Sequence, residues 1–258
     1  GVVFAAGSAW MLDLAGPGAP SRTSASLSVG FGFGPGVAGL ATLAPGSPLL
    51  VPYAIQLPVS LLTLLLAASV RVPVRRRDAG PPRRPGVGRW FVRVALVAPW
   101  IFAFPSVAFV TLAGGVSAGP PFVGLVAAVT LFSGAIAARA ATRTRAATAV
   151  AAGAAGLVVG ALAVGAASLT GVVGAAVLLG FGHGVLLARS LEWLAAEVDD
   201  RARGRAVGAT YVVAYSGFAA PWLLAVLGGS PAALLGAAAL AALTAALHAG
   251  LAWARPGP

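Results

Sequence analysis

Few polar side chains interrupt the long apolar stretches of this sequence, and these few are the candidates for chemistry. His183 lies in Gly180-Phe181-Gly182-His183-Gly184, near the middle of an apolar stretch at residues 170–194. Because an unperturbed imidazole titrates near neutral pH, His183 could relay a proton. A histidine buried between helices could equally serve as a hydrogen-bonding link. Both roles stay open at the level of sequence.

A charged pair and two tyrosines form a second group of candidates. Arg189 and Glu192 are three residues apart, a spacing that lets their side chains pair on one helix face. We interpret them as a structural pair, or as side chains that snorkel toward an interface. Tyr211 and Tyr215 are four residues apart, so they share a helix face and could line a cavity. Asp13, near the end of the first apolar segment, could act at a gate or as an anchor.

Further candidates come from two other apolar stretches. Gln56, Ser60 and Thr63 share one helix face and could line a cavity. Trp100 lies in a stretch with two prolines and with phenylalanines at positions 102, 104 and 109. These rings could form an apolar, aromatic wall for a substrate, although such rings more commonly face lipid or pack against other helices.

The composition indicates that water is not the main solvent of this chain. Its 258 residues are 59% hydrophobic and 9% charged, whereas about a quarter of the residues in soluble domains are charged. Cysteine is absent and there are only two histidines, so we expect no disulfide, metal or cofactor. No enzyme motif occurs, and an enzyme is not expected. The net charge of +11 comes from arginines gathered beside the apolar stretches, which argues against a nucleic-acid partner.

Nine apolar segments divide the chain, and a helix needs about 20 residues to cross a bilayer. We expect them at residues 1–14, 25–43, 48–70, 90–113, 122–138, 146–167, 170–194, 206–227 and 232–254. The first segment is too short to span, and because the sequence does not begin with Met, we interpret it as a truncated helix. The predicted fold is therefore an all-α integral membrane protein, with about eight full spans and one partial span.

The loops between these segments alternate in charge. Arginines occur near residues 15–24, 71–89, 139–145 and 195–205, whereas the loops near 44–47, 114–121, 168–170 and 228–231 are uncharged. The positive-inside rule places the arginine loops and the carboxy terminus in the cytoplasm of a multi-pass plasma-membrane protein. We interpret residues 71–89, rich in Arg and Pro, as a linker between helical halves at 1–70 and 90–258. A patch for anionic lipids is the alternative.

Glycines and a proline follow a regular spacing in the second segment. Gly30, Gly34, Pro35 and Gly39 fit the pattern Gly-x-x-x-Gly-Pro-x-x-Gly-Gly, with Ala38 in place of one glycine. Small residues let helix backbones approach closely and proline bends a helix, so the pattern has a packing role of its own. The general abundance of Gly and Pro in membrane helices is the alternative explanation.

This pattern resembles the signature of the fifth helix in transporters of the major facilitator superfamily, where it is associated with antiport. The resemblance implies a major-facilitator-type helical bundle. The first segment would be the end of the fourth helix, and residues 90–258 would be helices seven to twelve. Residues 28–39 and 211–222 each combine Gly, aromatic residues and Pro after a basic loop, as the repeated halves of a transporter would.

The same resemblance implies a gating loop after the eighth helix, with the pattern Gly-x-x-x-Asp-Arg-x-Gly-x-Arg. Gly134, Arg139 and Arg143 fit this pattern, but Ala138 and Ala141 replace the acid and the second glycine. Without the acid, this copy of the loop lacks one partner of the salt bridge that the resemblance implies.

Together these features predict a secondary active transporter of a small molecule, with proton-coupled efflux by alternating access. The resemblance supplies the antiport direction. The nearly uncharged membrane core favours a small amphipathic or hydrophobic substrate, because a charged one would need a buried counter-charge. The expected partners are this substrate, protons and the lipid bilayer, and the expected state is a monomer. The alternatives are a non-transporting membrane fragment or scaffold, and a membrane-embedded enzyme of lipids or isoprenoids.

Overall fold

The computed structural model is a bundle of helices, and no strand occurs among the residues it describes, which are 2–14, 16–44, 50–70 and 89–253. The elements are α1 (Val2–Leu14), η1 (Gly16–Gly18), α2 (Ala19–Ala41), α3 (Leu50–Ser69), α4 (Arg89–Ser106), the π-helical η2 (Val107–Leu112), α5 (Ala113–Gly115), α6 (Pro120–Ala137), η3 (Ala138–Arg143), α7 (Ala146–Gly165), α8 (Leu169–Glu197), α9 (Asp200–Tyr215), η4 (Ser216–Ala219), α10 (Ala220–Val226) and α11 (Pro231–Trp253). Each of the nine predicted segments overlaps one helix or one run of consecutive helices. The predicted linker at residues 71–89 lies outside the described residues, except for its last position.

Among the described residues, seven helical runs are long and apolar enough to cross a membrane, judged by length and composition. They are Leu50–Ser69, Trp90–Gly115, Pro120–Arg143, Ala146–Gly165, Leu169–Glu197, Ala202–Val226 and Pro231–Leu251. The structure is thus all-α and compatible with a multi-pass membrane protein. The short α1 is not among the seven, as expected. Nor is α2, which we predict as a full span, and residues 21–28 within it include four serines, a threonine and an arginine.

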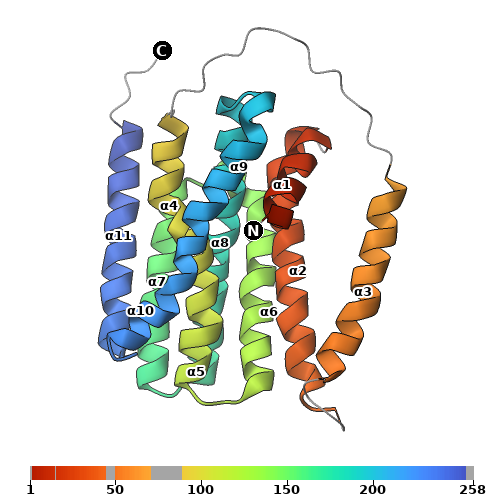
Figure 1. Ribbon diagram of the computed structural model, residues 1–258. Coiled ribbons are helices and arrows are strands. Elements are labelled where there is room, and N and C mark those ends of the chain that lie inside the picture. The colour runs from red at the N-terminus through yellow and green to blue at the C-terminus, as the bar shows by residue number, and fades with distance from the viewer. Residues whose placement is uncertain (1, 15, 45–49, 71–88, 254–258) are drawn as a thin grey trace.

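Consecutive helical runs are antiparallel, so their connections alternate between two ends of the bundle (Figure 1). At one end α1, α6, α8 and α11 finish, and α2, α7 and α9 begin. Arginines belong to this end, in the first turn of α2, in η3, just before α7 and at the start of α9. For the loops that the structure describes, the alternation of basic and uncharged connections therefore corresponds to the two ends of one bundle.

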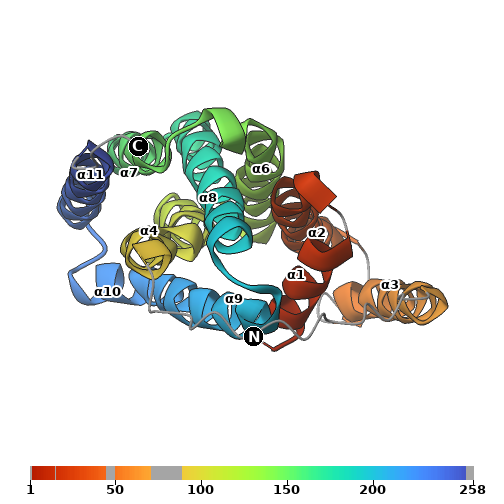
Figure 2. The ribbon, with the colours of Figure 1, turned by 90° about the horizontal axis from the view of Figure 1, so that it is seen from above.

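Helix α3 lies beside the bundle and approaches α2 near their connection (Figure 1; Figure 2). None of its residues is buried, and side chains such as Tyr53 and Leu57 are 74% and 73% exposed. A helix this apolar, exposed on every side of the described structure, requires lipid or another protein surface around it.

Helix α8 runs through the middle of the bundle and contacts α2, α4, α6 and α7 (Figure 2). Its tightest crossing is with α6. A Cβ atom added at Gly180 or Gly184 would collide with the backbone carbonyl of Thr130 or Gly134, respectively. One added at Gly134 would lie 2.9 Å from Cδ2 of His183 and 3.0 Å from the Gly180 carbonyl oxygen. The two backbones therefore touch directly, as small residues at a helix crossing allow.

Replacing Gly184 by Ala should destabilise the fold, because the new methyl group must displace the α6 backbone. Overpacking of this kind costs about 1–3 kcal/mol. Thermal unfolding of the purified protein in detergent would measure the change. Gly174→Ala on the same helix is the matched control, since an added Cβ there meets no atom within 4 Å. Equal melting temperatures for the two variants would contradict the close crossing.

Candidate functional site

His183 is a buried link between three helices. Its Nδ1 lies 2.6 Å from the Ile101 carbonyl oxygen on α4, and its Nε2 lies 3.2 Å from the Ser28 hydroxyl on α2. Because a carbonyl oxygen only accepts hydrogen bonds, Nδ1 donates to Ile101. In the neutral ring, Nε2 then accepts from the Ser28 hydroxyl. Of the two roles considered for His183, this geometry provides the interhelical link, and the proton relay stays a prediction.

Three serines with buried hydroxyl contacts join the first two helices to the carboxy-terminal ones, and we call this set the serine interface (Ser8, Ser24 and Ser28). The Ser8 hydroxyl is 2.9 Å from that of Tyr211, the Ser24 hydroxyl donates to the Gly184 carbonyl at 3.0 Å, and Ser28 meets His183. All three contacts are buried. The contacts are uncharged, and each gives a partner to one buried serine hydroxyl.

Five aromatic rings surround Phe102 on α4, beside the serine interface. Their centroids lie 4.8–6.4 Å from that of Phe102, and they belong to Phe31, His183, Tyr211, Tyr215 and Phe218. The predicted pair Tyr211 and Tyr215 thus lies in one group, which we call the aromatic cluster. It is buried at Phe102 and His183 but opens at Phe218, which is 48% exposed.

Two broken helices cross at this cluster. Helix α4 contains two prolines and continues into the π-helical η2, while the run from α9 to α10 is interrupted by η4. Gly217 of η4 lies so close to α4 that an added Cβ would collide with the Pro99 carbonyl and come within 2.6 Å of the Ala103 nitrogen. Irregular turns of this kind are frequent at functional sites and in transporters.

The Gly-Pro pattern of α2 divides into a packed part and an open part. An added Cβ at Gly39 would lie 3.0 Å from Cα of Gly124 on α6, and the Pro35 carbonyl oxygen would lie 2.6 Å from one added at Gly124. By contrast, an added Cβ at Gly30 or Gly34 would have nothing within 4 Å. The packing role suggested for the pattern therefore falls to its carboxy-terminal part.

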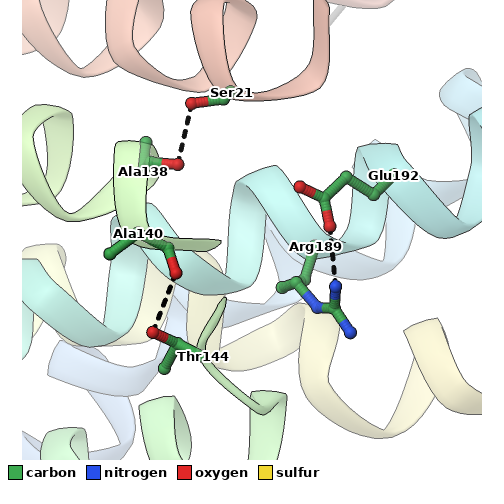
Figure 3. Close-up of polar contacts among 6 residues, drawn as sticks. All are labelled: Ser21, Ala138, Ala140, Thr144, Arg189 and Glu192. Atoms are coloured by element: carbon green, nitrogen blue, oxygen red, sulfur yellow. Dashed lines mark hydrogen bonds and ion pairs between the residues drawn. The ribbon is translucent and has the colours of Figure 1, made fainter. Parts of the chain in front are cut away.

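The charged pair of α8 lies at the end of the bundle where the arginines gather. Arg189 and Glu192 form an ion pair at 2.8 Å (Figure 3). The guanidinium carbon of Arg189 also lies 5.7 Å from the ring centroid of Trp193, which stacks on His248. An ion pair combined with a cation–π contact holds the Arg189 side chain in place, as a structural pair would.

The predicted gating loop corresponds to η3, and Arg139 and Arg143 are exposed there. Neither arginine takes part in the two ion pairs found among the described residues, Arg93–Glu197 and Arg189–Glu192. Instead, hydroxyl groups donate to backbone carbonyls at this loop, from Ser21 of α2 to Ala138 and from Thr144 to Ala140 (Figure 3).

The other two residues predicted for the gate lie outside η3. Gly134 lies in α6, at its crossing with α8. The side chain of Asp13 lies outside the described structure.

Gln56 and Trp100 lie apart from the aromatic cluster. On the exposed α3, the Gln56 amide donates to Ser60 at 3.0 Å. Trp100 stacks on Phe104, with centroids 5.2 Å apart, and its Nε1 donates to Thr244 at 3.3 Å. Residues 100 and 104 are one helical turn apart, whereas residue 102 lies on the other side of α4. The predicted aromatic wall is therefore two separate surfaces.

Sequence reasoning missed the serine interface and Phe218. Ser24 and Ser28 are four residues apart in α2, a spacing that could have identified one polar face. The contact between Ser8 and Tyr211 joins positions too far apart in the chain for any spacing rule.

The chemistry available at this site is uncharged, with one imidazole, two phenols, three serine hydroxyls and several rings. Such groups can stack with a ligand, form hydrogen bonds to it and carry a proton. Among the described residues, no group of three or more His, Cys, Asp or Glu could hold a metal ion. Comparisons of the chain with protein-family models, with curated proteins and with solved structures found no match.

Removing the Tyr211 hydroxyl should weaken the contact between α1 and α9. Tyr211→Phe leaves the buried Ser8 hydroxyl without its partner, which should lower the free energy of unfolding by about 1 kcal/mol. Tyr215→Phe is the matched control, because the Tyr215 hydroxyl makes no hydrogen bond within the described part of the chain. Denaturant unfolding in detergent compares them, and an equal loss in both variants would argue against the Ser8 contact.

Proposed function

We propose that this protein is a secondary active transporter that exports a small amphipathic or hydrophobic molecule in exchange for protons, by alternating access. The observation that carries this proposal is the serine interface beside the aromatic cluster. Alternating access needs two groups of helices that part and rejoin around a site near the middle of the membrane. Single hydroxyl contacts, each worth about 1 kcal/mol, suit an interface that must open and close.

Protonation of His183 would act on this interface directly. In the neutral ring, Nε2 accepts a hydrogen bond from Ser28 of α2. In the imidazolium, Nε2 carries a proton and donates, so the Ser28 hydroxyl must turn its own hydrogen away. Meanwhile the Ile101 carbonyl keeps its bond to Nδ1 in either state. A proton taken up at His183 therefore changes the bond between α2 and α8 and leaves the one to α4 intact.

The aromatic cluster suits a substrate with a ring or a lipophilic body. Phe218 and Tyr215 form its accessible side, where an incoming ring can stack, and the Tyr215 hydroxyl offers a polar contact. No Asp, Glu or Arg is among the residues of the cluster, so a strongly charged substrate would lack a buried counter-charge.

We assign the bundle to the major facilitator type on the Gly-Pro pattern of α2, with α4 to α11 as helices seven to twelve. The contact of Pro35 and Gly39 with α6 supports this assignment, because the pattern then lies where two groups of helices meet. Under the positive-inside rule, the end with the arginines faces the cytoplasm of the plasma membrane. We expect a monomer to be the working unit.

A membrane scaffold without transport activity is the second candidate. The observation in its favour is α3, whose apolar side chains are exposed throughout its length and could pack against another membrane protein.

Proton-coupled flux in inverted membrane vesicles tests the transport proposal. Vesicles with an acidic interior would be exposed to a panel of lipophilic cations and neutral drugs, and collapse of the pH gradient would be recorded. We expect His183→Ala to abolish the response and Pro35→Ala to reduce it roughly tenfold, a loss of about 1.4 kcal/mol of transition-state stabilisation. Pro58→Ala in the exposed α3 is the matched control and should behave as wild type.

Comparing the two variants separates the contribution of His183 to transport from that of the Gly-Pro helix α2. Loss in His183→Ala alone would assign the proton to His183 and remove the Gly-Pro helix from the coupling mechanism. A wild-type protein that collapses the gradient with none of the compounds would contradict transport and favour the scaffold.

A further inference from the structure

A cavity of about 340 Å³ lies between α4, α7, α10 and α11, away from the aromatic cluster. It is lined by Trp100 and Phe104 of α4, by Leu157 of α7, and by Leu224 and Leu240 of α10 and α11. Its volume is at the small end of the range for ligand pockets, roughly 300–1,000 Å³. The transport proposal assigns no role to it.

Small residues on facing helices keep this cavity open. The side chains at positions 103, 220, 233 and 237 are all alanine, and position 236 is glycine, where an added Cβ would meet nothing within 4 Å. Two irregular segments border the same space, since Val107 begins η2 and Ala220 follows η4. Larger side chains at these places would fill the volume, as protein interiors usually are filled.

The cavity opens toward the outside of the bundle. Its rim includes Leu223, Leu227 and Leu240, which are 50%, 68% and 58% exposed, whereas Phe104 and Leu157 at its inner wall are buried. A molecule dissolved in the surrounding lipid can therefore reach it without passing through the aromatic cluster.

The lining selects against charge and against hydrogen-bonding groups. Every lining residue is apolar, and the Trp100 indole nitrogen already donates to Thr244. The stacked rings of Trp100 and Phe104, inclined by 29°, offer an aromatic wall. A rigid ring system loses less conformational freedom on binding than a flexible acyl chain, which favours the ring as occupant.

We propose that this cavity binds a neutral, rigid aromatic or alicyclic molecule that enters from the lipid. The site is distinct from the aromatic cluster, and its occupation does not require that the protein transports anything.

Photolabelling with a neutral aromatic diazirine, 3-trifluoromethyl-3-phenyldiazirine, tests this site in the protein reconstituted into phospholipid nanodiscs. Mass spectrometry of the peptides that contain Leu224 and Leu240 would measure the yield as the probe concentration rises. We expect labelling of these peptides to saturate and to fall about tenfold when naphthalene is added in excess. Labelling of the peptide from α3 should rise without saturation, because α3 offers only exposed surface.

Filling the cavity should remove the saturable labelling. Gly236→Leu places a side chain in the open space, and Ala220→Leu fills it from the facing helix α10. The matched control is Gly174→Leu, the same substitution at an exposed helical glycine outside the cavity, and it should label as wild type. Melting temperatures establish that each variant is folded.

Two outcomes would overturn the site. Non-saturable labelling of the wild type, unaffected by naphthalene, would mean that lipid acyl chains fill the space, and this result needs no variant. Saturable labelling that survives in both folded cavity-filling variants would place the binding elsewhere.

Discussion

The direct contact between the backbones of α6 and α8 is the constraint on which the described site depends. Gly180 and Gly184 bring α8 against α6, and the absence of a side chain at Gly134 leaves room for the ring of His183. That ring then reaches the Ile101 carbonyl and the Ser28 hydroxyl together. A larger residue at this crossing would move the imidazole from both partners, so a steric feature of the backbone sets up the polar contacts of the interface.

The helices themselves could be predicted, because a bilayer-length apolar run is a property of consecutive residues. The arginine loops likewise indicated which helix ends lie together, and in the described residues the arginines at the start of α2, in η3 and at the start of α9 lie at one end of the bundle. The neighbours of each helix could not be predicted. They depend on contacts such as Gly39 with Gly124, between glycines that recur throughout the sequence and are distinguished only by their surroundings. The exposed position of α3 was equally beyond prediction, because α3 is as apolar as the helical runs inside the bundle.

The candidate site could be predicted only in part, because a sequence shows which residues are unusual but not which partners they contact. His183 and the tyrosine pair stand out as polar groups in apolar stretches, and all three lie at the aromatic cluster. Serines do not stand out, because a serine in a helix can satisfy its hydroxyl with its own backbone, as Thr210 does with the Ala206 carbonyl. Only the partner residue shows that Ser24 and Ser28 reach across to another helix.

Helix α4 separates two environments that the sequence presents as one aromatic stretch. Phe102 faces the imidazole and phenol groups, whereas Trp100 and Phe104 face a cavity without polar lining. Between them, the Ile101 carbonyl holds Nδ1 of His183. In the proposed proton cycle, this bond persists in both protonation states of the ring. Protonation therefore changes the hydrogen bond to α2 and leaves the one to α4 unchanged. The apolar cavity would then keep its shape while the serine interface opens and closes, and the two proposed sites could be occupied independently.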